Sequence, residues 1–229
     1  MGDVILKSIT LSSLEERYLE LSSSLVRTPT VKLTSPFLID LIKASQIYLK
    51  LECFQYSGTF KARGALSVAK QIPEKDKKFG ITAASAGNHA IAAAWAAKVE
   101  NLSAKVVMQT SANPFRISLA KTYGAEIIMK EGGVATFAEA DKLVREEKRT
   151  FIHPFDGVDT TLGAAGVGLE LIKDCTELDA VVVAVGGGGL MSGVAAAVKL
   201  KNSKCKVYGV EPRGANSMSQ SMVVNKPVT

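Results

Sequence analysis

Residues Val181–Leu190 read VVVAVGGGGL, and the helix-like segment MSGVAAAVKL follows them. Four glycines between a buried strand and a helix let the backbone adopt positive φ and present N–H groups beside the positive end of the helix dipole. A flexible linker is the alternative, but a linker would not lie between an apolar strand and an apolar helix. We therefore predict a phosphate-binding turn at Gly186, Gly187, Gly188 and Gly189.

The rest of the chain alternates short β-branched runs with stretches of helical period, which is typical of βαβ units around parallel sheet. The continuous apolar run before the glycines predicts a strand buried on both faces. A helix is expected from Pro114, capped by Asn113 and ending at Gly124, and another over Val134–Lys148. The expected strands are Ile47–Leu51, Ile81–Ala84, Lys105–Met108, Glu126–Met129, Phe151–His153, Ala180–Val185 and Val207–Val210.

The expected strands are unevenly distributed along the chain. Four fall between Gly80 and His153, which predicts a small α/β domain at residues 55–153. Residues 1–54 and 154–229 would form a second, larger domain from both ends of the chain. With only three expected strands, that domain would leave apolar surface and an unpaired sheet edge open to water.

Composition excludes several classes of protein. Of 229 residues, 47% are hydrophobic and 22% charged, as in ordinary globular chains. The longest apolar run, Ala90–Ala97, is far shorter than the roughly 20 residues of a membrane-spanning helix. The start, MGDVILKSITL, lacks the pattern of a secretory signal, so we expect a cytoplasmic protein.

Cysteine, histidine and charge narrow the classes further. The three cysteines are widely spaced and there are only two histidines, so neither a disulfide framework nor a zinc site is expected. The net charge of +6 comes from scattered lysines, which favours a solvated surface over a nucleic-acid-binding one. A modest positive field still favours anionic small molecules.

A second motif, SGTFKARGA at residues 57–65, predicts a turn that opens a helix with Lys61 in its first turn. The helix dipole opposes a cation there, so the pKa of Lys61 should be lowered and its amine should attack an aldehyde more readily. The alternative is an ordinary solvated lysine.

A third motif, TAASAGNHA at residues 82–90, again predicts strand, turn and helix. Its backbone N–H groups suit a carboxylate, with Ser85 as the helix N-cap and Asn88 donating from its side chain. The alternative for His89 is a packed histidine without chemistry. All three motifs lie at the carboxyl ends of predicted strands, where α/β sheets bind ligands, and together they suit pyridoxal phosphate acting on an amino acid.

The segments SGTFKARGA, ASAGNHA and GGGGL, in this order and spacing, resemble the serine/threonine dehydratase family, a branch of the fold-type II pyridoxal-phosphate enzymes that includes threonine ammonia-lyases and serine racemases. The resemblance runs from about Ile9 to the end of the sequence. It implies an α/β architecture like that of the tryptophan synthase β subunit, with two parallel-sheet domains. Because the family continues beyond the position of Thr229, the larger domain is expected to be incomplete.

The resemblance also implies roles for individual residues and an activity. Lys61 would hold pyridoxal 5'-phosphate as a Schiff base and remove the substrate α-proton. The reaction would be β-elimination from L-threonine or L-serine, giving a 2-oxo acid and ammonia, in a homo-oligomer. The remaining implied roles are Phe60 flanking the cofactor ring, Asn88 bonding its phenolic oxygen, Gly186, Gly187, Gly188, Gly189 and Leu190 binding its phosphate, and Ser85, Ala86, Gly87, Asn88 and His89 taking the substrate carboxylate.

The sequence departs from the family pattern at three places. Ala86 stands where racemases of this group have a serine, which favours dehydratase over serine racemase. Residues Gly163–Gly166 read GAAG where members commonly have Gly-Gln-Gly-Thr, which we interpret as a changed loop. In metal-activated members Glu211, a carbonyl near Ala215 and an aspartate bind a cation, but Ser217 replaces the aspartate, which argues against a metal site.

Two other functions remain open from the sequence. The altered GAAG segment and the short C-terminal part favour a catalytically inactive ligand-binding or interaction protein on the same scaffold. A nucleotide-dependent oxidoreductase is supported by Glu211, an acid at the distance where a ribose hydroxyl would be held, but the glycines do not fit the GxGxxG pattern.

Overall fold

The computed structural model describes residues 8–43 and 46–228, so the start of the chain, where no secretory signal is expected, lies largely outside it. Its helices are α2 Leu11–Ser22, α3 Pro36–Ile42, α4 Lys61–Lys70, α5 Glu74–Lys77, α6 Asn88–Val99, α7 Pro114–Thr122, α8 Gly132–Glu147, α9 Val158–Asp174, α10 Gly189–Lys201 and α11 Ser217–Val224, with 3-10 turns η1 Glu52–Phe54 and η2 Tyr56–Gly58. Its strands are β1 Thr30–Lys32, β2 Tyr48–Lys50, β3 Ile81–Ala84, β4 Ala104–Gln109, β5 Glu126–Lys130, β6 Thr150–Phe151, β7 Ala180–Ala184 and β8 Lys206–Val210. In the described part of the chain, no helix is both long and apolar enough to span a membrane.

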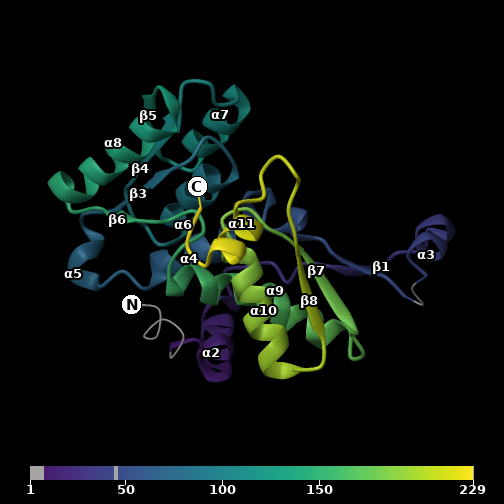
Figure 1. Cartoon of the computed structure of the whole chain (residues 1–229). Helices are drawn as coiled ribbons and strands as arrows, with labels where there is room; N and C mark the ends of the chain where they lie inside the picture. The colour runs from purple at the N-terminus through teal and green to yellow at the C-terminus, as the bar shows by residue number, and fades with distance from the viewer. Residues whose placement is uncertain (1–7, 44–45, 229) are drawn as a thin grey trace.

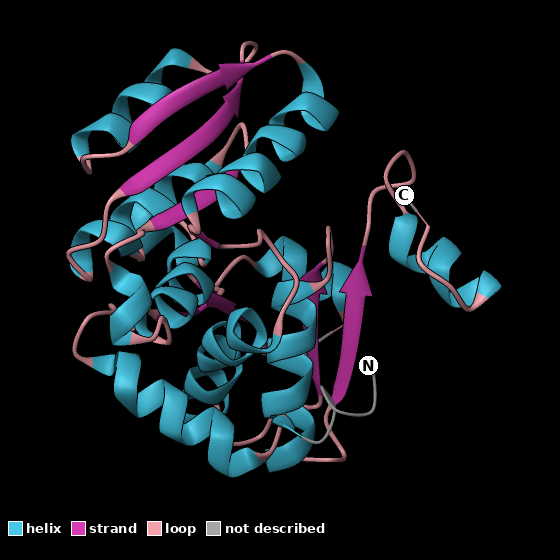
Figure 2. Ribbon diagram, turned by 90° about the vertical axis from the view of Figure 1, so that its left-hand side faces the viewer, coloured by secondary structure: helices cyan, strands magenta, loops and turns pink. Residues whose placement is uncertain are grey.

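The largest sheet is parallel, with strand order β5-β4-β3-β6. Helices lie on both of its sides (Figure 2). Ala83 and Val106 point to the side of α6 and α7, whereas Ala84 and Val107 point to the side of α8, where they meet Ala140. Because both faces are covered, neighbouring residues of these strands are apolar alike. The four strands expected between Gly80 and His153 are present, but the last one is Thr150–Phe151, so His153 lies after the strand and not in it.

Helices α4, α9 and α10 pack together in the centre of the molecule (Figure 1). Glycines let the backbones of these helices approach closely. A Cβ atom added to Gly163 would lie only 2.5 Å from the carbonyl oxygen of Arg63, and one added to Gly193 would lie 2.7 Å from that of Thr161, so a larger residue does not fit at either position. The GAAG segment Gly163–Gly166 is therefore part of helix α9, and its interpretation as a loop is wrong. Its small side chains serve helix packing.

Two small sheets complete the fold: the parallel pair β7–β8 and the antiparallel pair β1–β2. Strand β1 was not expected, because it has three residues, of which two are exposed, and so carries no apolar alternation. The expected strand Ala180–Val185 is covered on one face only, and its other face is apolar surface of the kind that a sheet of so few strands was expected to leave open. Val181 and Val183 pack under α9 and α10, but Val182 on the other face is 68% exposed.

The expected division into residues 55–153 and two flanking segments remains a prediction. Helix α4 packs against α6, which covers the four-stranded sheet, and also against α9 from the C-terminal half, so it lies between the two groups of elements. The first residues of α4, α6 and α10 consequently lie in the region where these groups meet.

Candidate functional site

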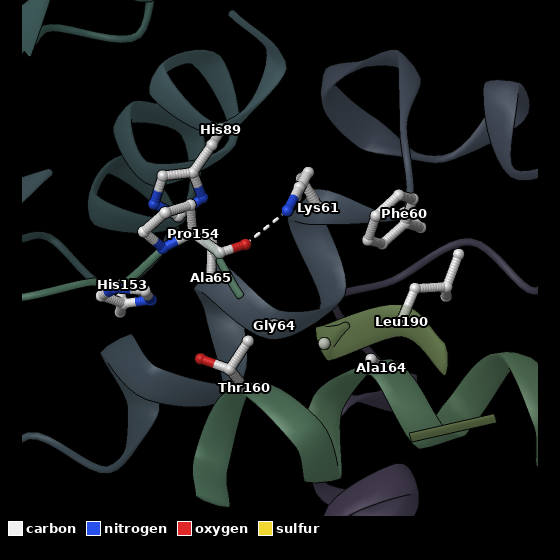
Figure 3. Close-up of a pocket in the computed structure, with 11 residues that line it drawn as sticks. Phe60, Lys61, Gly64, Ala65, His89, His153, Pro154, Thr160, Ala164 and Leu190 are labelled. Carbon is white, nitrogen blue, oxygen red and sulfur yellow. Dashed lines mark hydrogen bonds between the residues drawn. The ribbon is translucent and has the colours of Figure 1, made fainter. Parts of the chain in front are cut away.

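Lys61 is the first residue of α4, as predicted. The preceding turn holds Ser57 and Gly58 in the left-handed region, at φ 62° and 73°, and the Thr59 Oγ1 atom accepts a hydrogen bond of 3.1 Å from the Lys61 backbone N–H. The Lys61 Nζ atom donates to the Pro154 carbonyl oxygen (Figure 3). Burial lowers the pKa of Lys61, which increases the fraction of neutral amine at a given pH.

The tetraglycine turn leads directly into α10, whose N-cap is Gly188 in the left-handed region at φ 88°. An ordinary side chain is excluded at the preceding position, because a Cβ on Gly187 would lie 2.1 Å from the ring of Phe155. The first N–H groups of a helix have no intrahelical acceptor, so those of Gly189 and Leu190 are available to an anion.

One narrow hollow brings the starts of α4 and α10 together (Figure 3). Its volume of about 10 Å³ is room for a single water. The buried Thr160 Oγ1 atom has no hydrogen-bond partner among the described residues. The lining residues are Phe60, Lys61, Gly64, Ala65, His89, His153, Pro154, Thr160, Ala164, Gly189 and Leu190.

The turn before α6 differs from the prediction at one point. Its N-cap is Gly87, and Ser85 does not cap the helix; the Ser85 Oγ atom instead accepts a hydrogen bond of 3.1 Å from the Gly87 N–H within the turn. Asn88 opens α6 and lines a second groove of about 680 Å³, together with Ser57 and Arg116. The structure therefore places Asn88 in a different hollow from Lys61, on the side of α6 that faces α7.

His89 has a structural contact that the sequence did not identify. Its side chain is buried, and the Nε2 atom lies 2.8 Å from the carbonyl oxygen of Ile152 at the end of β6. Burial lowers the pKa of His89 to about 4, although the bond to Ile152 opposes the shift. The side chain is therefore neutral at pH 7, and only the backbone of this residue remains free for a substrate carboxylate.

The buried His89 predicts a loss of stability in acid. The unfolded chain binds a proton on this histidine below pH 6.5 and the folded chain only below about pH 4, so stability falls as the pH drops through that window. The loss should reach about 3 kcal/mol at pH 4 and below. Urea denaturation at pH 7, 5 and 4 should show this component in the unmodified protein and lack it in His89→Gln, while equal pH dependence of both would contradict it.

Sequence reasoning missed several residues around Lys61. His153 and Pro154 line the hollow, and Phe155 covers Gly187. All three follow β6, and the rule that ligands gather at the carboxyl ends of parallel strands is the signal that could have identified them. Thr160 and Arg116 gave no such signal, because their positions depend on how α9 and α7 pack.

Glu211, considered as a metal ligand and as a ribose-binding acid, has another role in the structure. Its carboxylate accepts hydrogen bonds from the backbone N–H groups of Met218 (2.9 Å) and Ser219 (2.8 Å) and from the Ser219 hydroxyl (2.7 Å). It therefore holds the first turn of α11, and these bonds lower its pKa, with the Ser219 hydroxyl as the largest cause. Among the described residues, no three His, Cys, Asp or Glu side chains lie together as a metal site, near Ala215 or elsewhere.

Comparison with known proteins identifies the family. Residues 21–229 match the model of the family described as pyridoxal-phosphate dependent enzyme. The chain belongs to that family. It is 45% identical over 187 residues to a phenylserine dehydratase of Ralstonia pickettii, an alignment that covers 82% of this chain and 57% of the relative.

Solved structures agree with this family. Maize serine racemase aligns with a TM-score of 0.91 and 32% identity over 96% of this chain and 66% of its own. A T.th. threonine deaminase aligns with a TM-score of 0.87 and 34% identity over 96% of this chain and 70% of its own. The predicted fold-type II architecture and the dehydratase resemblance are confirmed, and the chain spans about three fifths of the length of the curated relatives it matches.

Pyridoxal phosphate is the cofactor of this family, and the residues around the hollow fit its chemistry. Lys61 offers an amine for the aldehyde, the first turn of α10 offers N–H groups for the phosphate, and Thr160 offers a hydroxyl without a protein partner among the described residues. The hollow is too narrow for a pyridine ring as it stands. Binding therefore requires the surrounding side chains to move apart.

Proposed function

We propose that this chain carries the site of a dehydratase that converts L-threonine or L-serine into a 2-oxo acid and ammonia by pyridoxal-phosphate-dependent β-elimination. The observation that supports this most strongly is the position of Lys61. Its amine, with a lowered pKa, shares one hollow with the first residues of the helix that follows the tetraglycine turn. A lysine and a phosphate site that share one hollow suit the aldehyde and the phosphate of the cofactor.

Different residues of the chain have different roles in the proposed reaction. The bound cofactor supplies the electron sink for the charge left on the α-carbon. Lys61 accepts the α-proton at Nζ, which the Pro154 carbonyl holds in the hollow. The N–H groups at the start of α6 hold the substrate carboxylate. The β-hydroxyl group takes up one proton and leaves as water, which balances the α-proton that Lys61 removes.

The other functions have less support. Helix packing accounts for the GAAG segment, so this departure no longer favours an inactive protein. The Glu211 carboxylate accepts hydrogen bonds from the first turn of α11, so it is not free to bind a ribose hydroxyl, as a nucleotide-dependent oxidoreductase would require. One relative is a phenylserine dehydratase, so β-hydroxy amino acids larger than threonine belong among the substrates to be tested. The expected homo-oligomer and cytoplasmic location remain predictions.

The visible spectrum of the purified protein with added pyridoxal phosphate tests the proposal. We expect a yellow band that borohydride fixes, a labelled peptide containing Lys61, and ammonia with a 2-oxo acid on addition of L-threonine or L-serine. A fixed label without ammonia from any β-hydroxy amino acid would support the inactive protein instead. A label on a different lysine would contradict the assignment of Lys61.

Ala86 predicts which reaction L-serine undergoes. A lysine can move a proton on one face of the α-carbon, but racemisation needs an acid on the other face, and the Ala86 methyl group cannot supply one. Ammonia formed from L-serine should therefore exceed D-serine by at least about 100-fold. Ala86→Ser is the matched variant and should raise the D-serine fraction, while predominant D-serine from the unmodified protein would show that another acid serves that face.

A further inference from the structure

An aromatic cluster lies beside the Lys61 hollow and has no part in the proposed reaction. It consists of Phe137 from α8 with Phe151, His153 and Phe155 from the end of β6 and the segment after it. The His153 ring is the centre: its centroid lies 4.6 Å from that of Phe155, 5.7 Å from that of Phe151 and 6.4 Å from that of Phe137. Phe137 and Phe155 are each 39% exposed, so part of this aromatic surface is open to a ligand.

The cluster is continuous with the proposed catalytic site. His153 lines the same hollow as Lys61, and the carbonyl that holds the Lys61 Nζ atom belongs to Pro154, between His153 and Phe155 in the chain. Phe155 also covers Gly187 of the tetraglycine turn. His153 is therefore the ring of the cluster that lines the hollow in which Lys61 lies.

The surface suits an uncharged aromatic group. The His153 Nδ1 atom accepts N–H bonds of 3.3 Å from Phe155 and 2.8 Å from Asp156, so its proton is on Nε2 and the ring is the neutral tautomer. Burial lowers the pKa of His153, which favours the same state. Three of the ring pairs meet edge-on or tilted around His153, and a further aromatic ring could join them in the edge-to-face arrangement that such groups prefer.

We infer that Phe137, His153 and Phe155 form a subsite for an aryl group on the β-carbon of the substrate, so that the favoured substrate class is the β-aryl-β-hydroxy-α-amino acids. The inference rests on the proposed function. In the reaction the α C–H and β C–O bonds break and a carbon–carbon double bond forms. The hydroxyl leaves as water, and one water then hydrolyses the product imine to ammonia and a 3-aryl-2-oxo acid.

Phe137 offers the cleanest test, because it joins the cluster from α8 through its ring contacts with Phe151 and His153. With pyridoxal phosphate bound, kcat/KM for L-threo-3-phenylserine should exceed that for L-threonine at least tenfold. Phe137→Ala should reduce the ratio of the two values about tenfold, the scale of a well-formed apolar subsite. Phe137→Leu keeps an apolar side chain and should reduce the ratio less, and it serves if the alanine variant fails to fold.

The control is Phe37→Ala, which removes an exposed phenylalanine of α3 and should leave the ratio unchanged. A second measurement separates the aryl subsite from the proposed reaction, because L-phenylalanine and L-alanine have no β-hydroxyl to eliminate. Calorimetry should show tighter binding of L-phenylalanine by about tenfold or more, and Phe137→Ala should remove this advantage. If no substrate is turned over but the preference persists, the subsite stands and the proposed reaction fails; equal affinities or an unchanged ratio in Phe137→Ala would overturn the subsite.

Discussion

Replacing Lys61 with alanine is expected to lower the rate of β-elimination by at least about 1,000-fold, the scale of a lost general base, and to remove the borohydride-fixed label. The reason is specific to its position: Lys61 is the first residue of α4, its amine lies in the hollow, and burial lowers its pKa. The measurements are ammonia release from L-threonine and the visible spectrum with pyridoxal phosphate. The fold should persist, because the residue is only partly buried and lies at a helix end.

Lys70→Ala is the matched control, because it removes the same side chain from the last residue of the same helix. Lys70 pairs with Glu100 at 3.3 Å, away from the hollow, and its loss should change elimination less than twofold. Lys61→Arg adds a second control, since it keeps the positive charge but cannot give up its proton at neutral pH, and it should be as inactive as Lys61→Ala. Full turnover by either Lys61 variant would remove the basis of the proposed function.

Local turn chemistry explains why the sequence predicted the helix starts near this site. Ser57 and Gly58 form a left-handed turn before α4, Gly188 forms another before α10, and Pro114 with Asn113 starts α7. These signals act within a few residues, so tertiary packing did not override them. The strands of the four-stranded sheet were predictable for a related reason, because their apolar runs are short and bounded by turns.

The features that the sequence did not predict are contacts between distant parts of the chain. His89 is buried because the carbonyl of Ile152, 63 residues later, lies beside it. The GAAG segment of α9 was interpreted as a changed loop because it departs from the family pattern, and only the close approach of α4 shows why its glycines are there. No local pattern contains this information.

The buried ion network around Arg63 is a further feature that the sequence did not indicate. Arg63 is 1% exposed and forms bonds of 2.8 and 2.9 Å to both Glu52 and Glu170, while Lys50 lies 2.7 Å from Glu170. Burial acts to lower the pKa of Arg63, but the hydrogen bonds and charges of the two carboxylates outweigh it and raise the pKa overall. The network joins the β1–β2 region, α4 and α9. Its central residue, Arg63, follows Lys61 by two positions in α4.

Removing Arg63 is therefore expected to cost about 3–5 kcal/mol of folding stability, because Arg63→Met leaves Glu170 buried with one cation in place of two. Urea denaturation at pH 7 measures this loss. Arg145→Met is the matched control: this arginine lies in the last turn of α8, outside the ion network, and its loss should change stability by about 0.5 kcal/mol or less. Arg63→Lys should be intermediate, because an ammonium cannot bond both carboxylates in the paired geometry of a guanidinium.

A double-mutant cycle separates the ion pair from simple loss of packing. Glu170→Gln removes the carboxylate that pairs with Arg63. In the double variant with Arg63→Met, position 170 therefore carries no buried charge that lacks its arginine partner. The two losses should therefore sum to more than the loss in the double variant, by at least about 1 kcal/mol. Additive losses would show that Arg63 and Glu170 are not coupled, and that Arg63 stabilises α4 through its bonds to Glu52 and through packing.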